Sequence, residues 1–363
     1  MSARRPGRCR LLWLTSSCLP ARICMGKRAA GDENGRTSTR RGILVLGVAV
    51  LGYGTMGRVH VEALRRIQGV RVVGIYTRRP VPGVWPAPRY DEMKPLVARK
   101  DVHVVDICLP THLHLEAVQL AAECGKHIFL EKPLVRRPEQ VPAIRDAIKR
   151  AGVQLMVGHV LRFFPEYQQL HRIALARGAK GVAGAARRSS MPAGEDDWYG
   201  DVGKSGGVVL DLSIHDFDFC RWTLGPVREV FCRTAAGGRY ALTTLVHDNG
   251  SLSHIEGSWL DAPGLTMEFE LAGKGYLLQY SSAAAVPLRV WTRGDDGAAA
   301  GAFRLPLGKT PYQRELEAFF DSLRRNEAPP VTWEAALESA AVAWAALRSA
   351  ESRRPVSPKE VVS

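Results

Sequence analysis

Residues 43–57 read ILVLGVAVLGYGTMG and lead directly into a helical pattern that ends near Arg66. The apolar part, residues 43–51, is rich in Val, Ile and Leu and is typical of a parallel strand buried on both faces. A glycine-rich turn between such a strand and a helix is the arrangement that binds dinucleotides. The flanking strand and helix favour this interpretation over a turn with only a structural role.

The turn has the pattern G-x-G-x-x-G, and each glycine has a physical reason to be there. Gly52 permits a tight turn, Gly54 lets the backbone approach a pyrophosphate, and Gly57 lets the next helix pack close to the strand. The first N–H groups of that helix and its dipole then point toward the phosphates. We therefore predict that this turn, including Thr55 and Met56, binds the cofactor.

Strands and helices alternate through residues 42–160, which we expect to form one domain. The expected strands are Val70–Tyr76, Val102–Leu109, His127–Leu130 and Val153–Val157, and the expected helices are Met93–Arg99, His112–Cys124 and Glu139–Ala151. This alternation predicts a doubly wound parallel sheet of the Rossmann type. Ligands of such sheets gather at the carboxyl ends of the strands, where Thr77, Pro110 and Lys132 lie.

Residues 161–355 have a different pattern and are expected to form a second domain. It begins with a helix at Pro165–Arg177, a strand at Val182–Arg188 and a helix at Val208–Leu224, and it ends with helices at Pro311–Arg325 and Trp333–Ala350. Between them, strands are expected at 229–234, 240–247, 251–259, 266–272 and 275–280, with Asn249-Gly250 as a hairpin turn that has positive φ at both central positions. Runs of strands indicate an open, mostly antiparallel sheet, so the fold class is α/β with two domains.

The composition is that of an ordinary soluble protein, with 46% hydrophobic and 24% charged residues among 363. No apolar run approaches the roughly 20 residues of a membrane span. Residues 1–41 carry a net charge of +8 of the total +14, so the remainder is mildly basic. Because no Lys/Arg cluster is interleaved with aromatic residues, we expect no nucleic-acid partner. The absence of a long apolar run leads us to expect no membrane partner.

The seven cysteines include no C-x-x-C pair, and Cys108, Cys124 and Cys220 lie in apolar segments. Reduced cysteines in a cytoplasmic enzyme fit this pattern better than disulfides or a metal site. Residues 1–41 are interpreted as a disordered basic extension; a start assigned too far upstream, with Met25 as the true start, is the alternative.

Asp211, His215 and Asp218 stand at i, i+4 and i+7, so one helix would present all three on one face. A histidine can accept a proton near neutral pH, and a neighbouring carboxylate can orient it and hold its tautomer. An N-terminal cap with a packed histidine is the structural alternative. No H-E-x-x-H motif or Cys/His cluster supports a metal, and none is expected.

Lys132 follows a strand and could stabilise negative charge on a substrate oxygen, whereas most lysines are simply solvated. His112 and His114 follow Pro110, and one of them could line a nicotinamide pocket or lie on the surface. Arg162 begins the crossover between the domains and is interpreted as mainly structural.

Residues 77–79 carry the evidence on cofactor choice. NAD-binding members of this fold usually have an Asp or Glu about 20 residues beyond the glycine-rich turn. Here Thr77, Arg78 and Arg79 occupy that place, and a guanidinium can bind a 2′-phosphate bidentately. NADP(H) is therefore favoured over NAD(H); a solvated loop with the ribose held by backbone groups is the alternative.

The ordered motifs of residues 43–357 resemble the Gfo/Idh/MocA oxidoreductases, which include inositol and glucose–fructose dehydrogenase-type enzymes. The matching motifs are Gly52-x-Gly54-x-x-Gly57-x-x-His60, Pro110-Thr111-x-x-His114, Glu131-Lys132-Pro133, Gly206-Gly207-x-x-x-Asp211-x-x-x-His215-Asp216-x-Asp218 and Tyr312-x-x-Glu315-Leu316-x-x-Phe319. The resemblance implies a Rossmann domain with an open-sheet α/β domain that is often used for oligomer contacts. It also implies that Lys132, Asp211 and His215 form the catalytic set, with cofactor contacts from Pro110, His114, Glu131 and Lys132. Many members have Asn after the proline, where this chain has Thr111 and His112.

These observations predict a cytoplasmic NAD(P)-dependent dehydrogenase that acts on a secondary alcohol of a sugar, inositol or related polyol. His215 would take the hydroxyl proton, Lys132 would stabilise the alkoxide, and Asp211 would orient His215. The resemblance also predicts a homo-oligomer, either a dimer or a tetramer. A non-catalytic NAD(P)-binding sensor or scaffold on the same fold, and a reductase of an imine or double bond, are the alternatives.

Overall fold

The computed structural model describes residues 45–78, 85–191, 198–294, 297–303 and 308–362. The basic segment 1–41, the first two residues of the predicted first strand and Arg79 lie outside the described residues. In the described part, no helix combines the length and apolar character that crossing a membrane requires.

The first sheet has six parallel strands, which confirms the predicted Rossmann domain. They are β1 (Leu46–Leu51), β2 (Val70–Tyr76), β3 (Arg89–Tyr90), β4 (Val104–Ile107), β5 (His127–Glu131) and β6 (Leu155–Gly158), in the spatial order β3-β2-β1-β4-β5-β6. The strand order reverses between β1 and β4, and ligands of doubly wound sheets bind in the crevice at that point.

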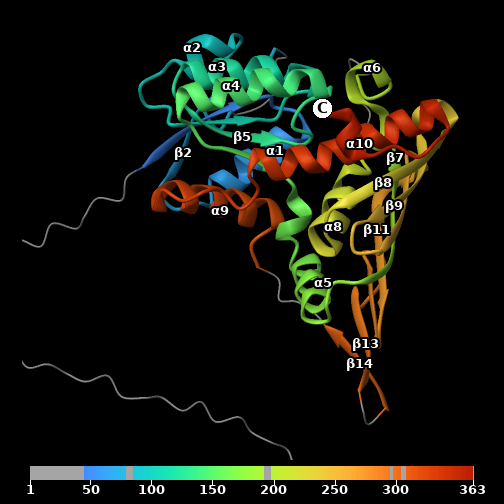
Figure 1. Cartoon of the computed structure of the whole chain (residues 1–363). Coiled ribbons are helices and arrows are strands. Elements are labelled where there is room, and N and C mark those ends of the chain that lie inside the picture. Colours follow the sequence, from blue (N-terminus) through green and yellow to red (C-terminus); the bar gives the residue numbers. More distant parts are fainter. Residues whose placement is uncertain (1–44, 79–84, 192–197, 295–296, 304–307, 363) are drawn as a thin grey trace, which may run out of the picture. The chain divides into compact units, whose positions relative to one another are not determined.

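Helices cover both faces of this sheet (Figure 1). On one face, α1 (Thr55–Leu64) packs beside α9 (Pro311–Arg325), and both contribute to an apolar cluster with the sheet. On the other face lie α2 (Met93–Val97), α3 (His114–Glu123) and α4 (Val141–Ala151). Helix α9 thus packs on the first sheet although it follows the second domain in the sequence.

The second sheet is mixed and mostly antiparallel, as predicted. Its strands are β7 (Gly181–Ser190), β8 (Val227–Ala235), β9 (Tyr240–His247), β10 (Leu252–Ser258), β11 (Leu260–Gly273), β12 (Tyr276–Ser281), β13 (Leu288–Gly294) and β14 (Gly297–Phe303), in the order β14-β13-β12-β11-β7-β10-β9-β8. Among the described strands of this second sheet, only the β7–β10 pair is parallel. Strands β13 and β14 were not predicted.

One face of this sheet packs against α5 (Pro165–Ala176), α8 (Ile214–Leu224) and α10 (Trp333–Ser352) (Figure 1). Tyr167 of α5 is fully buried, and its ring meets the ring of Phe219 edge-on at 4.7 Å between centroids. Phe219 in turn meets Phe269 of β11 at 4.9 Å, also edge-on. These aromatic contacts fix the helices to the sheet.

Two local predictions were wrong. In the turn between β9 and β10, only Gly250 has positive φ (81°), and the Asn249 side chain instead accepts a hydrogen bond from the Ser251 N–H. The expected helix Val208–Leu224 is broken into α7 (Gly207–Asp211) and α8. At the break the Ser213 N–H reaches back five residues to the Val208 carbonyl oxygen at 2.8 Å.

Candidate active site

A cavity of about 580 Å³ opens at the carboxyl ends of the first sheet's strands and extends to the second domain. It is lined by Gly52, Tyr53, Gly54, Thr55, Met56, Arg58, Tyr76, Thr77, Arg78, Cys108, Leu109, Pro110, Thr111, Leu113, Glu131, Lys132, Trp198, Tyr199 and Asp211. Most predicted cofactor contacts are therefore gathered in one place. Gly57, His114 and His215 are not among the lining residues.

Backbone geometry explains the glycines at two positions of the turn and leaves open space at the third. Gly52 has φ of 99°, and a Cβ there would lie 2.4 Å from the Cys108 carbonyl oxygen. A Cβ on Gly57 would lie 2.0 Å from the Gly52 carbonyl oxygen, so this glycine serves close packing and not the lining itself. Gly54 precedes α1, and a Cβ there would meet nothing within 4 Å. The open space at Gly54 fits close approach of phosphate oxygens to the backbone.

Lys132 connects the two domains at the floor of the cavity. Its Nζ donates to the Asp211 carboxylate at 2.9 Å and to the Asp211 carbonyl oxygen at 2.7 Å. The side chains of Lys132 and Asp211 are only 14% and 10% exposed. An ammonium has three N–H donors, so these two bonds leave one for a ligand in the cavity.

The prediction that Asp211 orients His215 was wrong. The Asp211 carboxylate instead accepts a hydrogen bond from the Lys132 ammonium at 2.9 Å, and α7 ends at Asp211 before α8 begins at Ile214. The Nδ1 atom of His215 is buried and has no hydrogen-bond partner among the described residues. Burial, followed by the charges of Lys132 and Arg187, holds the pKa of His215 well below its ordinary value. The ring is therefore neutral at neutral pH, and it is a weaker base than an ordinary histidine.

Asp218, the third member of the predicted face, is engaged elsewhere. Its carboxylate accepts two hydrogen bonds from the Arg162 guanidinium, at 2.6 and 2.8 Å, and one from the Ser339 hydroxyl at 2.6 Å. Burial alone would raise the pKa of Asp218, but His159 and Arg162 outweigh it and lower the pKa. Asp218 and Arg162 thus form a buried structural ion pair, as expected for Arg162.

His114 lies behind the cavity wall and not in it, which corrects the expectation of a nicotinamide contact. It is 1% exposed, and its ring nitrogens lie 2.8 Å from the Pro133 carbonyl oxygen and 2.9 Å from that of Leu109. Burial lowers the pKa of His114. The ring therefore connects the loops that follow β4 and β5.

The outer end of the cavity contains the residues expected at the adenosine ribose. Thr77 is buried, and its carbonyl oxygen accepts a hydrogen bond from Arg89, while Arg78 is exposed. Two further residues of the lining, Tyr53 and Arg58, were not singled out by the sequence analysis. Tyr53 packs against Trp85 at 5.0 Å between centroids, and the Arg58 guanidinium lies 5.7 Å from the Tyr53 ring. A basic residue in the first turn of the helix after the glycines was the available signal for Arg58.

The inner end contains an aromatic pair that the sequence analysis passed over. The rings of Trp198 and Tyr199 lie 3.9 Å apart between centroids, and Trp198 is 6.5 Å from His112. Both aromatic residues line the cavity on the side of the second domain. Their position a few residues before Gly206-Gly207 was the only signal in the sequence.

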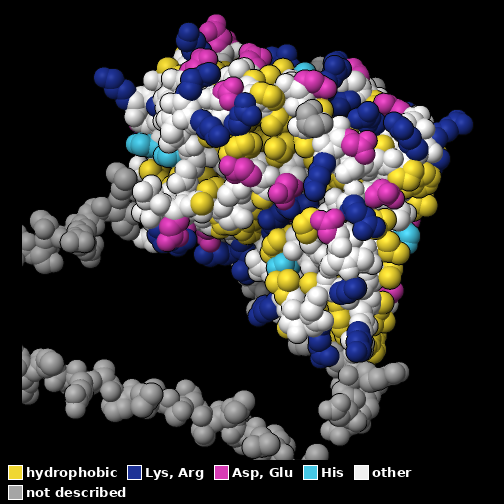
Figure 2. Space-filling view, in the orientation of Figure 1, with side chains coloured by type: hydrophobic (Ala, Val, Ile, Leu, Met, Phe, Trp, Pro, Cys, Tyr) yellow, Lys and Arg dark blue, Asp and Glu magenta, His cyan; other side chains and the backbone are white. Residues whose placement is uncertain are grey.

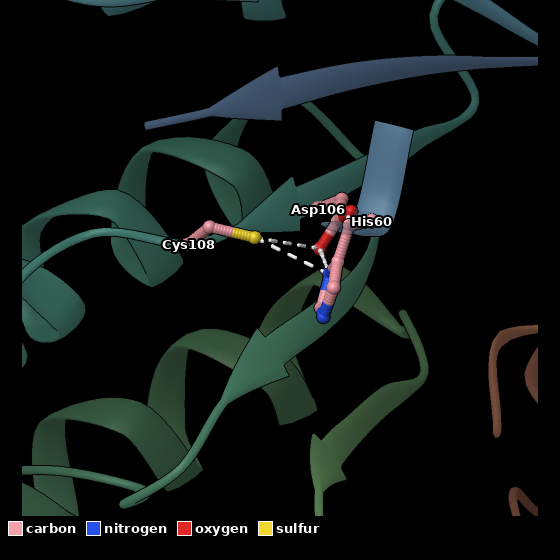
Figure 3. Close-up of side chains that lie close together, drawn as sticks. All are labelled: His60, Asp106 and Cys108. Carbon is pink, nitrogen blue, oxygen red and sulfur yellow. Dashed lines mark hydrogen bonds and ion pairs between the residues drawn. The ribbon is translucent and has the colours of Figure 1, made fainter. Parts of the chain in front are cut away.

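The side chains of His60, Asp106 and Cys108 lie close together (Figure 3), and the first two are buried. The Nδ1 atom of His60, a carboxylate oxygen of Asp106 and the Sγ atom of Cys108 all lie within 4.8 Å of one another. The sequence analysis expected no metal ligands, and this is a ligand-type group within the described residues. Hydrogen bonds among its members account for the spacing: Nδ1 lies 3.1 Å from the Asp106 carboxylate and 3.3 Å from Sγ.

Comparison with known proteins identifies the family. Residues 46–159 match an oxidoreductase family with an NAD-binding Rossmann fold, and residues 179–277 match the GFO/IDH/MocA C-terminal domain. The chain belongs to the Gfo/Idh/MocA family. It is thus an NAD(P)-dependent oxidoreductase, as the resemblance predicted.

Similar Gfo/Idh/MocA proteins include named dehydrogenases. A myo-inositol 2-dehydrogenase from Thermotoga maritima is 29% identical over 336 residues, which are 87% of this chain and 99% of that protein. D-xylose 1-dehydrogenase (NADP(+)) 2 from Haloferax volcanii is 28% identical over 257 residues, 68% of this chain and 77% of that protein. The crystal structure of a probable dehydrogenase from Thermotoga maritima matches with a TM-score of 0.72 and 26% identity, covering 87% of this chain and all of that one.

Proposed function

We propose that this enzyme transfers hydride between NADP(H) or NAD(H) and a secondary alcohol or ketone of a sugar, inositol or related polyol. The observation that carries the proposal is the Lys132–Asp211 pair, which leaves one ammonium N–H for a ligand in the cavity. The names of the similar proteins, which include inositol and xylose dehydrogenases, support the substrate class.

In oxidation, Lys132 donates its remaining N–H to the substrate oxygen and stabilises the negative charge that develops there. We assign the acceptance of the hydroxyl proton to His215, which is neutral because burial and nearby cations lower its pKa. Since His215 does not line the cavity, this step requires the substrate to extend from Lys132 toward α8. Asp211 holds the ammonium in place through two hydrogen bonds. A bound nicotinamide supplies the hydride acceptor, and reduction follows the same path in reverse.

The aromatic pair Trp198–Tyr199 supports a polyol substrate. Hydrogens on the ring carbons of a sugar or cyclitol form an apolar face that packs on aromatic rings, while its hydroxyls need polar partners. The cavity offers both, since the aromatic pair lies in the same lining as Lys132 and Glu131. The decisive experiment is to measure NAD(P)H absorbance against a panel of inositols, pentoses and hexoses. Tight cofactor binding without turnover of any polyol or imine substrate would favour the sensor alternative.

We further propose that NADP(H) is preferred over NAD(H). The support is Thr77 and the exposed Arg78 at the edge of the cavity, where a carboxylate would repel a 2′-phosphate. Fluorescence titration with NADPH and NADH tests this directly. The change Arg78→Ala should narrow the difference in affinity, whereas Arg71→Ala, on the preceding strand β2 and outside the cavity lining, should not. Equal affinity of the unmodified enzyme for both cofactors would contradict the preference.

The remaining proposals concern assembly and location. Val182 and Leu242, which are 49% and 50% exposed, project from the second sheet on the face opposite the helices, beside the small residues Gly184 and Ala186. Figure 2 shows hydrophobic side chains along this side of the molecule. We propose that a second copy of the chain covers this face, and sedimentation of Leu242→Glu tests it.

Free cysteines support a cytoplasmic location.

A further inference from the structure

We propose that His60 is a positioning residue that acts on Lys132 through Glu131. This inference rests on the proposed function, in which Lys132 contacts the substrate oxygen. His60 lies on α1, the helix that follows the glycine-rich turn, and it does not line the cavity. Its effect on the reaction must therefore pass through other side chains.

His60 is fully buried between two carboxylates. Its Nδ1 atom lies 3.1 Å from each oxygen of Asp106 on β4, and its Nε2 atom lies 3.1 Å from Oε1 of Glu131 at the end of β5. Figure 3 shows the ring directed toward Asp106 and Cys108. The ring thus spans from the cofactor-binding helix to the two strands whose ends form the cavity.

The charges around the ring favour an imidazolium. Its Nδ1 atom forms hydrogen bonds to Asp106, whereas its Nε2 atom lies at ion-pair distance from Glu131 without hydrogen-bond geometry. Carboxylates only accept hydrogen bonds, so a ring that faces one at each nitrogen is best satisfied as an imidazolium. Burial alone would lower the pKa of His60, but the Cys108 and Asp106 side chains outweigh it and hold the pKa well above its ordinary value. Burial alone would likewise raise the pKa of Glu131, but the charged His60 ring lowers it. The Glu131 carboxylate is therefore held ionised and pulled toward α1.

Glu131 carries this constraint to Lys132. Its second oxygen, Oε2, accepts a hydrogen bond from the Lys132 backbone N–H at 3.1 Å. The Lys132 ammonium is held at the other end by Asp211. One continuous set of contacts, His60–Glu131–Lys132–Asp211, therefore runs from the helix of the glycine-rich turn to the second domain.

This connection has a chemical purpose. The first turn of α1 is expected to hold the cofactor's pyrophosphate, and Lys132 is proposed to hold the substrate oxygen. Hydride transfer requires the two reactants to meet in a near-attack geometry, and a misplacement of 1 Å can cost about 100-fold in rate. By fixing Lys132 relative to α1, His60 keeps the two binding positions in register.

Glu315 provides a matched control because it is buried in the same neighbourhood without touching Lys132. It is fully buried on α9, and its two carboxylate oxygens have no hydrogen-bond partner among the described residues. Burial, followed by the nearby Glu131 charge, raises the pKa of Glu315 well above its ordinary value. Its carboxyl group is thus neutral and can be replaced by an amide with little change in charge.

The test compares Glu131→Gln, His60→Gln and Glu315→Gln on a confirmed substrate. We expect kcat to fall about 10- to 100-fold in the first two variants and to stay near normal in Glu315→Gln. Cofactor affinity should stay within about twofold in His60→Gln, because His60 does not line the cavity. The double variant of His60 and Glu131 should lose no more than either single variant, because both act on one contact. Rates that fall equally in all three variants, or losses that multiply in the double variant, would overturn the proposal.

Further measurements separate this proposal from the proposed function. Normal turnover in Lys132→Met would contradict the proposed function. If Lys132→Met is inactive but Glu131→Gln and His60→Gln keep a normal kcat, only the positioning role of His60 is contradicted. If His60→Gln does not fold, the kcat values of Glu131→Gln and Glu315→Gln still test the positioning role. A stoichiometric metal in the purified enzyme that is lost in Cys108→Ser would also overturn the proposal, since Nδ1 would then be a ligand.

Discussion

Replacing Lys132 with Met removes the ammonium while keeping most of the side chain's length and its packing. Two hydrogen bonds to Asp211 are lost, together with the N–H that we propose for the substrate oxygen. The Asp211 carboxylate, only 10% exposed, is then left without its cation. The change should therefore affect both turnover and stability, for different reasons.

The two effects have separable magnitudes. Removing a donor that is aimed at charge developing in the transition state costs about 10²–10³ in kcat, or roughly 2.7–4 kcal/mol. Leaving a nearly buried carboxylate without its partner costs about 1–3 kcal/mol of the free energy of unfolding. Adding Asp211→Asn removes the orphan charge, so the double variant should regain part of that stability while its turnover stays low.

The assays are straightforward once a substrate is found. Turnover is followed by NAD(P)H absorbance, cofactor affinity by fluorescence titration, and stability by urea unfolding of both variants. We expect low kcat, cofactor affinity near that of the unmodified enzyme, and a urea midpoint that rises when Asp211→Asn is added to Lys132→Met. A kcat within about threefold of normal for Lys132→Met would refute the role of the ammonium.

Three further predictions follow from the buried titratable groups. The acid limb of kcat/KM for oxidation should be centred below pH 6.5, because the pKa of His215 is lowered. The variant His215→Ala should lose this limb. A limb centred above pH 6.5 would contradict the role of His215 as proton acceptor. Glu315→Gln should stabilise the protein increasingly as pH rises above about 4.5. The Glu315 carboxyl group ionises there in the unfolded chain but stays neutral in the folded protein, where its pKa is raised. Urea unfolding at pH 5 and pH 8 compares the free energy of unfolding of the variant with that of the unmodified protein. Asp218→Ala should cost about 3–5 kcal/mol in the same assay by leaving Arg162 unpaired and buried, and a loss under 1 kcal/mol would show the pair to be dispensable.

The sequence predicted the first domain well because its signals are local. Val70–Tyr76 has the predicted bounds, since a mostly apolar run marks it. In the second predicted domain, the helix Pro311–Arg325 also has its predicted bounds, because Thr310 caps its start and Pro311 follows directly. In contrast, residues 297–303 read GAAAGAF, which contains little of the β-branched and aromatic character typical of strands. Their pairing with β13 depends on the neighbouring strand and could not be predicted from composition.

The break between α7 and α8 could not be predicted because it also depends on tertiary packing and not on the local sequence pattern. A helical periodicity continues through Val208–Leu224, and only the tertiary structure shows why the helix stops. Ser213 packs against β10, where a Cβ on Gly257 would lie 2.2 Å from the Ser213 hydroxyl oxygen. The sequence therefore identified Asp211 and His215 as candidates but assigned the wrong partner to Asp211.

The break also explains how one helical segment can serve two purposes. Asp211 ends α7 and holds the Lys132 ammonium, whereas Asp218 lies inside α8 and pairs with Arg162. An unbroken helix would place both carboxylates along one face, where they would compete for the same cations. Because the backbone turns after Asp211, one carboxylate reaches the first domain's cavity while the other stays in the core of the second. The proposed chemistry thus depends on the register of the two domains at Lys132.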